Sequence, residues 1–285
     1  MKNISIILPA KNEAASLKTL LPALTLAIPG AEIIIVDDGS ADDTVDVCRA
    51  FQVKVISHPY SMGNGAAVKT GARAAQGDIL VFMDADGQHK PEDVPRLLQK
   101  LSEGYDMVVG ARSRESQAGA HRAAANGFYN RLASWMVNQK IADLTSGFRA
   151  VSAKKFRQFL YLLPNGFSYP TTTTMSFFRA GYPVAYVPVE APRRIGKSHM
   201  RLMRDGVRFF LIIFKIGTLY SPLKLFFPVS LSFFSVGLLY YIYSYVYFNR
   251  FSNMSVLLFI SSVLTFLIGL VSEQITSLNY KDSDR

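Results

Sequence analysis

The stretch DILVFMDADGQHKPED (residues 78–93) places a short apolar run directly before a turn rich in polar side chains. Residues 79–82 are continuously apolar, which predicts a strand buried on both faces, because a half-exposed strand alternates. Asp84 and Asp86 follow at once, and Gly87 permits a tight backbone turn. Two aspartates at a turn are by themselves typical of a solvated loop. Their meaning depends on what the fold places beside them.

The same order of strand and polar turn recurs through residues 4–110. Apolar runs at 4–8, 32–36, 53–56, 78–83 and 106–110 are separated by helical stretches at 14–27, 42–51, 66–75 and 92–101. This alternation predicts an α/β fold with a mostly parallel sheet and helices on both faces. Open α/β sheets bind ligands at the carboxyl ends of their strands. We therefore expect PAKNE (9–13), DDGS (37–40) and DADGQH (84–89) to form one site.

The residue types in this expected site favour a divalent cation bound with a diphosphate. Carboxylate and amide oxygens suit Mg²⁺ or Mn²⁺, which usually take few protein carboxylates and complete their shell from phosphate and water. Two other phosphate-binding patterns fail on spacing. GNGAAVKT (63–70) has Val68 where a phosphate-binding loop requires glycine, and it lacks the third glycine of the dinucleotide fingerprint. The four histidines are scattered and show no zinc-ligand spacing.

The bulk composition bounds the class of protein. The chain has 285 residues and a formal charge of +10, which indicates an anionic partner such as a phosphorylated substrate or an acidic lipid. No interleaving of aromatic and basic residues typical of nucleic-acid binding occurs in residues 1–190, so no nucleic-acid partner is expected. The one cysteine, Cys48, excludes an internal disulfide and is expected to be packed. The N-terminal apolar run ends at Pro9 and is too short for a secretory signal.

Two uncharged segments near the C-terminus predict a transmembrane hairpin. Residues 225–248 and 251–272 contain no charged side chain, and each is long enough to cross a bilayer, which takes about 20 helical residues. Tyrosines gather toward the end of the first segment, as an interfacial belt does. We expect helices at 223–248 and 251–272 and a tail at 273–285. A pair of buried soluble helices is the alternative.

Basic residues before the hairpin predict its orientation. Eight lysines and arginines lie between 193 and 224, whereas the loop between the helices offers only Arg250. The positive-inside rule therefore places residues 1–198 and the tail in the cytoplasm, which makes a multi-pass protein of the plasma or inner membrane. Residues 199–222 mix basic and apolar residues at helical spacing, which predicts amphipathic juxtamembrane helices on the membrane surface. An ordinary core-packing helix is the alternative for this segment.

The ordered set ILPAKNEAASL (7–17), IIIVDDGSADDT (33–44), GNGAAVKTGARAAQGD (63–78), MDADGQHKPED (83–93), GARSR (110–114) and DLTSGFRA (143–150) resembles glycosyltransferase family 2. Within that family the chain is most similar to the polyprenyl-phosphate glycosyltransferases, the dolichyl-phosphate mannose synthase group. The resemblance covers about residues 3–200. It implies a GT-A fold, a nucleotide diphosphate sugar donor with a GDP or UDP moiety, and inversion at the anomeric carbon. Self-association is a further expectation from relatives with a short hairpin.

The resemblance assigns donor and metal roles to individual residues. Pro9, Ala10, Asn12 and Glu13 are implied in nucleoside binding, Asp37 and Asp38 in holding the base or ribose, and Asp84 in contacting the ribose and diphosphate. Asp86 and Gln88 are implied as metal ligands. Residues 40–43 also suit a helix N-cap. PRRIGKSHMR (192–201) resembles a segment that closes over the donor diphosphate, with Arg194 and Lys197 as contacts, although the same residues fit a positive-inside flank.

The acceptor side is expected to be lined with arginines. A lipid phosphate is already an anion, so it needs no general base, and guanidinium groups match its geometry while staying protonated. The resemblance implies this role for Arg112, for Arg122 with Asn126, and for Ser146 and Arg149. The spacing from Arg112 to Arg122 is shorter than in the best-known relatives, so Arg114 is an alternative to Arg122. Asp143 is expected to orient one of the arginines or to support the structure.

The prediction is an inverting, metal-dependent enzyme that moves one hexose, mannose or glucose first, to polyprenyl phosphate. One alternative is a processive polysaccharide synthase, which usually carries a Gln-x-x-Arg-Trp motif; the only tryptophan here is Trp135, outside such a motif. The other is a non-catalytic membrane protein that binds nucleotide sugars. Unpaired carboxylates at one site repel one another and serve no folding need, which favours a working enzyme.

Overall fold

The computed structural model describes residues 3–112, 120–166, 168–190, 214 and 217–281, with the side chains of 120–126 and 279–281 left out. The chain forms two compact units, Met1–His199 and Met200–Arg285.

The first unit is built on a sheet whose strand order is β3-β2-β1-β4-β6-β5-β7 in the described residues. The strands are β1 (Ile4–Ala10), β2 (Glu32–Asp37), β3 (Lys54–Ser57), β4 (Ile79–Phe82), β5 (Met107–Arg112), β6 (Arg149–Ser152) and β7 (Val184–Val189). All neighbours pair in parallel except β6, which is antiparallel to both β4 and β5. The predicted α/β fold with a mostly parallel sheet is confirmed.

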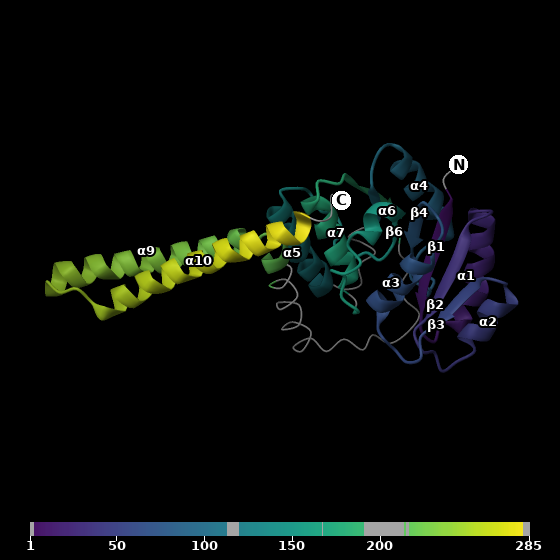
Figure 1. Ribbon diagram of the computed structural model, residues 1–285, viewed down its shortest axis with the longest axis horizontal. Coiled ribbons are helices and arrows are strands. Elements are labelled where there is room, and N and C mark those ends of the chain that lie inside the picture. The colour runs from purple at the N-terminus through teal and green to yellow at the C-terminus, as the bar shows by residue number, and fades with distance from the viewer. Residues whose placement is uncertain (1–2, 113–119, 167, 191–213, 215–216, 282–285) are drawn as a thin grey trace. The chain divides into compact units, whose positions relative to one another are not determined.

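Helices cover both faces of this sheet (Figure 1). They are α1 (Ala14–Ala27), α2 (Thr44–Ala50), α3 (Asn64–Ala74), η1 (Pro91–Asp93), α4 (Val94–Ser102), α5 (Ala120–Val137), α6 (Ala153–Arg157) and α7 (Tyr169–Arg179). Apolar residues of α1, α2 and α4 form one core with alternate side chains of the central strands, and Cys48 lies in it as expected. On the other face Phe82 of β4 packs on Phe156 of α6, with ring centroids 4.7 Å apart.

A close approach fixes α3 against the sheet. A Cβ at Gly71 would lie 2.4 Å from the Ile7 side chain and 3.2 Å from that of Val36. Larger residues at position 71 therefore force the helix away from β1 and β2. The run GARAA has few large apolar residues and therefore gives a weak helical pattern. It belongs to the end of α3 because its small residues, Gly71 and Ala72, are buried in this contact.

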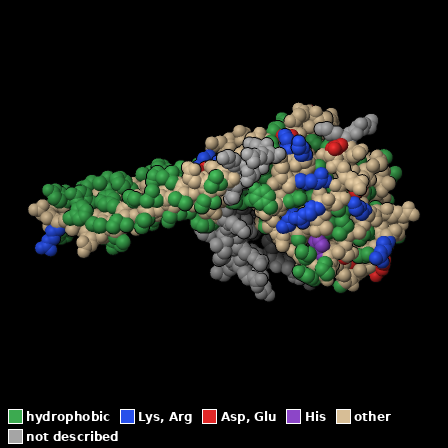
Figure 2. Space-filling model, viewed as in Figure 1, with side chains coloured by type: hydrophobic (Ala, Val, Ile, Leu, Met, Phe, Trp, Pro, Cys, Tyr) green, Lys and Arg blue, Asp and Glu red, His purple; other side chains and the backbone are tan. Residues whose placement is uncertain are grey.

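The second unit is a hairpin of α9 (Pro222–Phe248) and α10 (Asn253–Lys281), and Figure 1 shows the two helices side by side. Both helices are long and apolar enough to cross a membrane. In their most apolar parts only 11% of the residues of α9 and 17% of those of α10 are buried within the structure. Figure 2 shows hydrophobic side chains over the visible face of the hairpin. Ser230 and Ser262 exchange hydrogen bonds across it, each hydroxyl donating to the other's carbonyl, at 3.0 and 2.9 Å. Helix α10 continues through most of the segment expected to be a tail.

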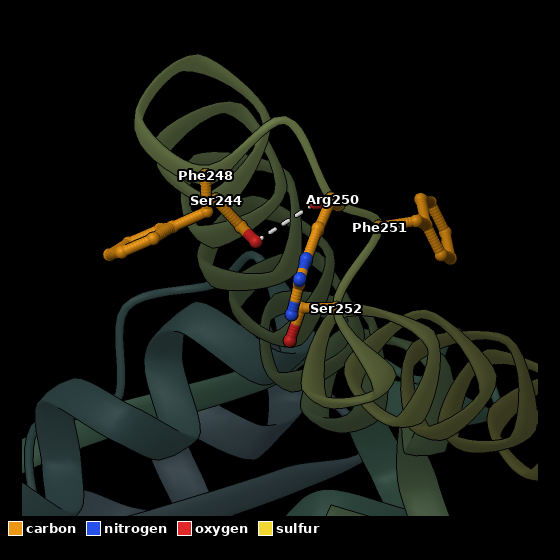
Figure 3. Close-up of a pocket in the computed structure, with 5 residues that line it drawn as sticks. All are labelled: Ser244, Phe248, Arg250, Phe251 and Ser252. Atoms are coloured by element: carbon orange, nitrogen blue, oxygen red, sulfur yellow. Dashed lines mark hydrogen bonds between the residues drawn. The ribbon is translucent and has the colours of Figure 1, made fainter.

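The hairpin turns at Asn249, which ends α9 in the left-handed conformation. The Ser244 hydroxyl donates to the Arg250 carbonyl over 3.0 Å and closes the turn (Figure 3). A shallow pocket at this turn is lined by Ser244, Phe248, Arg250, Phe251 and Ser252. Its lining includes one arginine and no carboxylate, so it is not the acidic site that the sequence predicts.

Candidate functional site

The polar segments singled out in the sequence meet at one edge of the sheet. Strands β1, β2, β4 and β5 run in the same direction and end at Ala10, Asp37, Phe82 and Arg112. Strand β6 runs the opposite way, so it begins at this edge, with Arg149 paired to Phe82. The PAKNE, DDGS, DADGQH, GAR and DLTSGFR segments therefore lie around a common edge, although they are up to about 140 residues apart in the chain.

The acidic turn after β4 is held by its own backbone. Gly87 has a φ of +73°, and the Gln88 amide donates to Asp86 Oδ1 over 3.1 Å. The Asp84 amide donates to Nδ1 of His89, also over 3.1 Å. His89 is buried and stacks on Phe148, with ring centroids 4.9 Å apart. His89 thus supports the turn and is not directed outward as a ligand.

Burial of His89 also explains its protonation state. Burial lowers the pKa of His89, against the opposing effect of the nearby carboxylates of Asp84 and Asp86. The ring is therefore neutral at neutral pH, which leaves Nδ1 free to accept the Asp84 amide proton. A buried imidazolium at this place would lose that hydrogen bond.

The Asp84 carboxylate is half-buried, and no group in the described part of the chain donates a hydrogen bond to it. Among the described residues no cluster of three or more His, Cys, Asp or Glu side chains is arranged to hold a metal. The residues nevertheless fit a cation such as Mg²⁺ or Mn²⁺, because the carboxylates of Asp84 and Asp86 and the side-chain amide of Gln88 lie on one turn. Such ions take most of their ligands from phosphate and water, so few protein ligands are needed.

Arg112 lies at the end of β5 in an ion pair with Asp143. Its Nε donates to Asp143 Oδ2 over 2.8 Å, and its Nη2 donates to Asp143 Oδ1 over 3.1 Å and to the Thr145 hydroxyl over 2.7 Å. Burial alone would raise the pKa of Asp143, but the hydrogen bonds and charge of Arg112 hold it below its usual value. Asp143 is almost fully buried, whereas the Arg112 side chain is 28% exposed. No described group accepts from Nη1 of Arg112, so this nitrogen remains available to an anion.

Arg149 differs from Arg112 in that it is fully buried. Its guanidinium donates to the carbonyls of Ser146 and Pro170 and to the Thr174 hydroxyl. These bonds tie the segment before β6 to helix α7. Because every part of the side chain is enclosed, we assign Arg149 a structural role in place of the predicted phosphate contact. Ser146 is also turned inward, since its hydroxyl donates to the Gly110 carbonyl over 2.7 Å.

The two aspartates of DDGS also have different surroundings. Both carboxylate oxygens of Asp38 are occupied, by His58 at 2.8 Å, the Ser61 hydroxyl at 2.8 Å, and the amides of Met62 and Gly63 at 2.7 and 2.9 Å. We therefore assign Asp38 to holding the loop 58–63 in place of the predicted base or ribose contact. Asp37 Oδ1 accepts only the Ser40 amide, over 3.0 Å, and Oδ2 has no donor among the described residues.

The segment after β1 is joined to the segment after β2. Asn12 has a φ of 57°, its amide donates to the Ser40 hydroxyl over 2.9 Å, and its Oδ1 accepts the Ala41 amide over 2.8 Å. The Ala14 amide donates to Asp42, which also accepts the Thr44 amide. Asp42 therefore bonds the first backbone amides of both α1 and α2, whereas Asp43, the N-cap residue of α2, makes no capping hydrogen bond with its side chain. Glu13 accepts the Ser16 hydroxyl, and Pro9 and Ala10 are the last residues of β1.

Several predicted residues lie outside the described part of the chain. Arg114, Arg194 and Lys197 belong to segments that are not described, and the side chains of Arg122 and Asn126 on α5 are likewise not described. The sequence predictions missed Thr145, which bonds Arg112, and Tyr169, which lies beside Asp84. For Tyr169 the only signal was its position in YPTTTT, a run that is buried as the first half of α7.

Comparison with known proteins yields two matches to families. The model of glycosyl transferase family 2 matches residues 5–160, and the model of the GtrB C-terminal hairpin matches residues 221–278. Curated relatives include undecaprenyl-phosphate 4-deoxy-4-formamido-L-arabinose transferases. The one from Yersinia enterocolitica is 34% identical over 155 residues, which is 51% of this chain and 45% of that protein. The one from Aeromonas hydrophila is 32% identical over 157 residues, with the same coverage. The chain spans about half the length of the curated relatives it matches.

Solved structures with a similar fold include glucosyl-3-phosphoglycerate synthase from Mycobacterium tuberculosis. Its complex with Mn²⁺ and UDP-glucose has a TM-score of 0.60 and 25% identity, covering 74% of this chain and 79% of that one. Its complex with Mn²⁺, UDP and glucosyl-3-phosphoglycerate has a TM-score of 0.58 and 26% identity, covering 76% and 79%.

Proposed function

The chain belongs to glycosyl transferase family 2, and from this membership we propose that it transfers a single sugar from a nucleoside diphosphate donor to polyprenyl phosphate. The observation that carries the proposal is the meeting, at one sheet edge, of the acidic turn of Asp84 and Asp86 with the Arg112–Asp143 pair. One group suits a metal-bound diphosphate, and the other suits an anionic acceptor. The relatives' named acceptor, undecaprenyl phosphate, supports a polyprenyl phosphate here.

On the donor side, we assign Asp86 and Gln88 to a divalent cation and Asp37 and Asp84 to the nucleotide sugar. Mg²⁺ or Mn²⁺ held by these residues would neutralise negative charge that develops on the departing nucleoside diphosphate. Asp86 is suited to this role because the Gln88 amide fixes the direction of one of its oxygens. The Mn²⁺ and UDP in the solved neighbour support this assignment, and they make UDP sugars the first donors to test. GDP sugars are the second.

On the acceptor side, Arg112 positions the lipid phosphate. Asp143 and Thr145 hold Nε and Nη2, so the guanidinium keeps one orientation and presents Nη1. The phosphate oxygen attacks the anomeric carbon from the face opposite the leaving group, which inverts its configuration. No general base is needed, because the nucleophile is already an anion. Since an arginine does not give up its proton, the phosphate stays nucleophilic.

The hairpin anchors the enzyme to a membrane, and its match to the GtrB hairpin supports this part of the proposal. Basic residues between 193 and 224 favour a cytoplasmic catalytic unit. The transferred sugar is a hexose in the sequence-based expectation and a formamido-arabinose in the named relatives, so both classes belong in the test.

The test uses membranes that contain the full chain, MnCl₂, undecaprenyl phosphate and labelled UDP or GDP sugars. The expected product is soluble in organic solvent, carries one sugar, and releases it in mild acid. Polymer that stays at the origin of the chromatogram would instead indicate a processive synthase. Donor binding without any lipid product across the donor panel would overturn the proposal.

A further inference from the structure

One side chain of helix α5 brackets Asp143 in the turn of residues 141–146, which we call the Asp143 turn. Asn130 Nδ2 donates to the Ala142 carbonyl over 2.8 Å, and Asn130 Oδ1 accepts the Leu144 amide over 3.0 Å. These two partners stand immediately before and after Asp143 in the chain. A side-chain amide can do this because it carries a donor and an acceptor side by side. Asn130 therefore fixes the backbone at Asp143 from outside the turn.

A second residue of α5 strengthens this connection. The Ser134 hydroxyl accepts the Ile141 amide over 3.0 Å and donates to the Asn130 carbonyl over 2.5 Å. Residues four apart lie on the same side of a helix, so one side of α5 bonds the Asp143 turn. The helix is itself packed into the unit, because Ala133 and Met136 are buried. It therefore gives the turn a firm support.

Inside the turn, the backbone sets the direction of the Asp143 carboxylate. Oδ1 accepts the amides of Thr145 and Ser146, both over 3.1 Å. The same carboxylate accepts from Nε and Nη2 of Arg112. A displacement of the turn relative to β5 would therefore carry the carboxylate with it and turn the guanidinium of Arg112.

The bonds to α5 are needed because the turn is otherwise held from the side of β5. The Ser146 hydroxyl donates to the Gly110 carbonyl, and the Arg112 amide donates to Asp143 Oδ2 over 3.3 Å. These bonds hold the turn from Asp143 onward, whereas those from α5 also hold the residues before it. The Arg112 side chain is partly exposed, so packing alone does not fix its direction. Its direction depends on the hydrogen bonds of Asp143.

We propose that Asn130 is a positioning residue for the acceptor phosphate, which acts through Asp143 on Arg112. This inference rests on the proposed function, because it takes Arg112 as the contact of the lipid phosphate. The position of the guanidinium matters because the phosphate oxygen must lie in line with the anomeric carbon. A misplacement of about 1 Å at a reacting group can cost about a hundredfold in rate.

The test is steady-state kinetics of the full chain in detergent, with undecaprenyl phosphate varied at a saturating concentration of a donor that wild type uses. Asn130→Ala removes both bonds, and Asn130→Asp keeps the acceptor but removes the donor to Ala142. We expect both variants to lower kcat/KM for undecaprenyl phosphate at least about tenfold and to leave the KM for the donor unchanged. Ser134→Ala should have a smaller effect, and Ser134→Thr, which keeps the hydroxyl, should restore the wild-type value.

Two controls separate positioning from a general loss of stability. Ser5→Ala also removes two hydrogen bonds of a buried side chain, one to the Glu32 carboxylate and one from the Gly77 amide. Because Ser5 lies near the start of β1, at the sheet edge opposite the site, this variant should melt earlier but keep the acceptor kinetics of wild type. In an Arg112→Ala background, Asn130→Ala should have little further effect, because the group through which it acts is gone.

The outcomes separate this inference from the proposed function. If wild type forms the lipid-linked sugar and Asn130→Ala has the same kcat/KM for the acceptor, the positioning role is refuted while the proposed function stands. The same conclusion follows if Ser5→Ala shows an equal loss, or if the loss is undiminished in the Arg112→Ala background. If wild type forms no lipid-linked sugar with any donor, both fail. Asn130→Asp, which keeps the size of the side chain, decides the question if Asn130→Ala does not fold.

Discussion

Replacing Asp38 by alanine, and comparing the result with the same change at Asp37, tests whether one aspartate serves folding and the other serves donor binding. Asp38 accepts four hydrogen bonds, two of them from the backbone amides of Met62 and Gly63, which cannot turn toward water without moving the loop. Each buried donor left without a partner costs about 1–3 kcal/mol. Allowing for water that enters the space and for relaxation, we expect Asp38→Ala to lower the free energy of unfolding by about 3–5 kcal/mol.

Asp37→Ala is the matched control. Its Oδ1 accepts one backbone amide, that of Ser40, and Oδ2 accepts none from the described residues. The expected loss of stability is therefore about 1 kcal/mol. For a unit of this size 1 kcal/mol corresponds to about 2–4 °C in melting temperature, so Asp38→Ala should melt roughly 10 °C below wild type and Asp37→Ala within a few degrees of it. The donor affinity should show the opposite order, with the larger loss in Asp37→Ala.

The assay is thermal unfolding of the full chain in detergent, combined with titration of UDP in the presence of Mn²⁺ at a temperature where both variants are folded. Acid unfolding adds a second check. Burial would raise the pKa of Asp38, but its hydrogen bonds lower it overall, so its stabilisation is complete above the unfolded value near 3.9 and is lost as the pH falls through the folded value. Asp38→Ala should lack this part of the acid transition. Equal melting temperatures for the two variants, or a specific loss of UDP binding in Asp38→Ala, would refute the assignment.

Three further changes test other parts of the site. Asp86→Ala should abolish sugar transfer, to less than about 1% of wild type, because the charge on the departing diphosphate would lose its metal-bound partner. Membrane insertion should stay unchanged, since Asp86 lies in the turn after β4 and not in the hairpin helices. Near-normal transfer, or full activity in chelator, would contradict the metal assignment. Arg112→Lys should raise the KM for undecaprenyl phosphate at least about tenfold with little change in donor affinity, since an ammonium cannot keep three bonds to Asp143 and Thr145 and also present a nitrogen to phosphate. An unchanged acceptor KM would remove Arg112 from that role. His89→Gln should flatten the loss of stability below about pH 6.5. Burial lowers the pKa of His89 in the folded state, so below that pH the unfolded state binds a proton that the folded state does not. Parallel pH profiles for the variant and wild type would show that another group is responsible.

The fold and the location of the site follow from local patterns in the sequence. Strands β1, β2 and β4 are short apolar runs that end in polar turns. The run and the turn can both be recognised within a stretch of about ten residues. The rule that parallel strands end at one edge then brings Asp37, Asp84 and Arg112 together without any knowledge of side-chain packing. The hairpin follows in the same way from two uncharged segments.

The roles of identical residue types do not follow from such patterns. Asp37 and Asp38 are neighbours in one motif, yet the loop 58–63, twenty or more residues away in the chain, donates hydrogen bonds to the carboxylate of Asp38 only. Strand β6 was also missed, because RAVS is four residues long and begins with a charged residue. Helix α7 gives little helical signal, since four threonines disfavour a helix until burial and bonds from their hydroxyls to preceding carbonyls compensate.

The contrast between Arg112 and Arg149 shows what the fold adds to residue type. Both arginines lie at the same sheet edge, but Arg112 bonds a carboxylate and remains 28% exposed, whereas Arg149 is fully buried and donates to uncharged oxygens. Burial lowers the pKa of Arg149, and its Nε has no partner among the described residues, so keeping this cation enclosed opposes folding. In return, the planar guanidinium holds the carbonyls of Ser146 and Pro170 with one rigid group. The segment that carries Gly147 is thereby held close to Asp84 by an arginine that is itself fully buried.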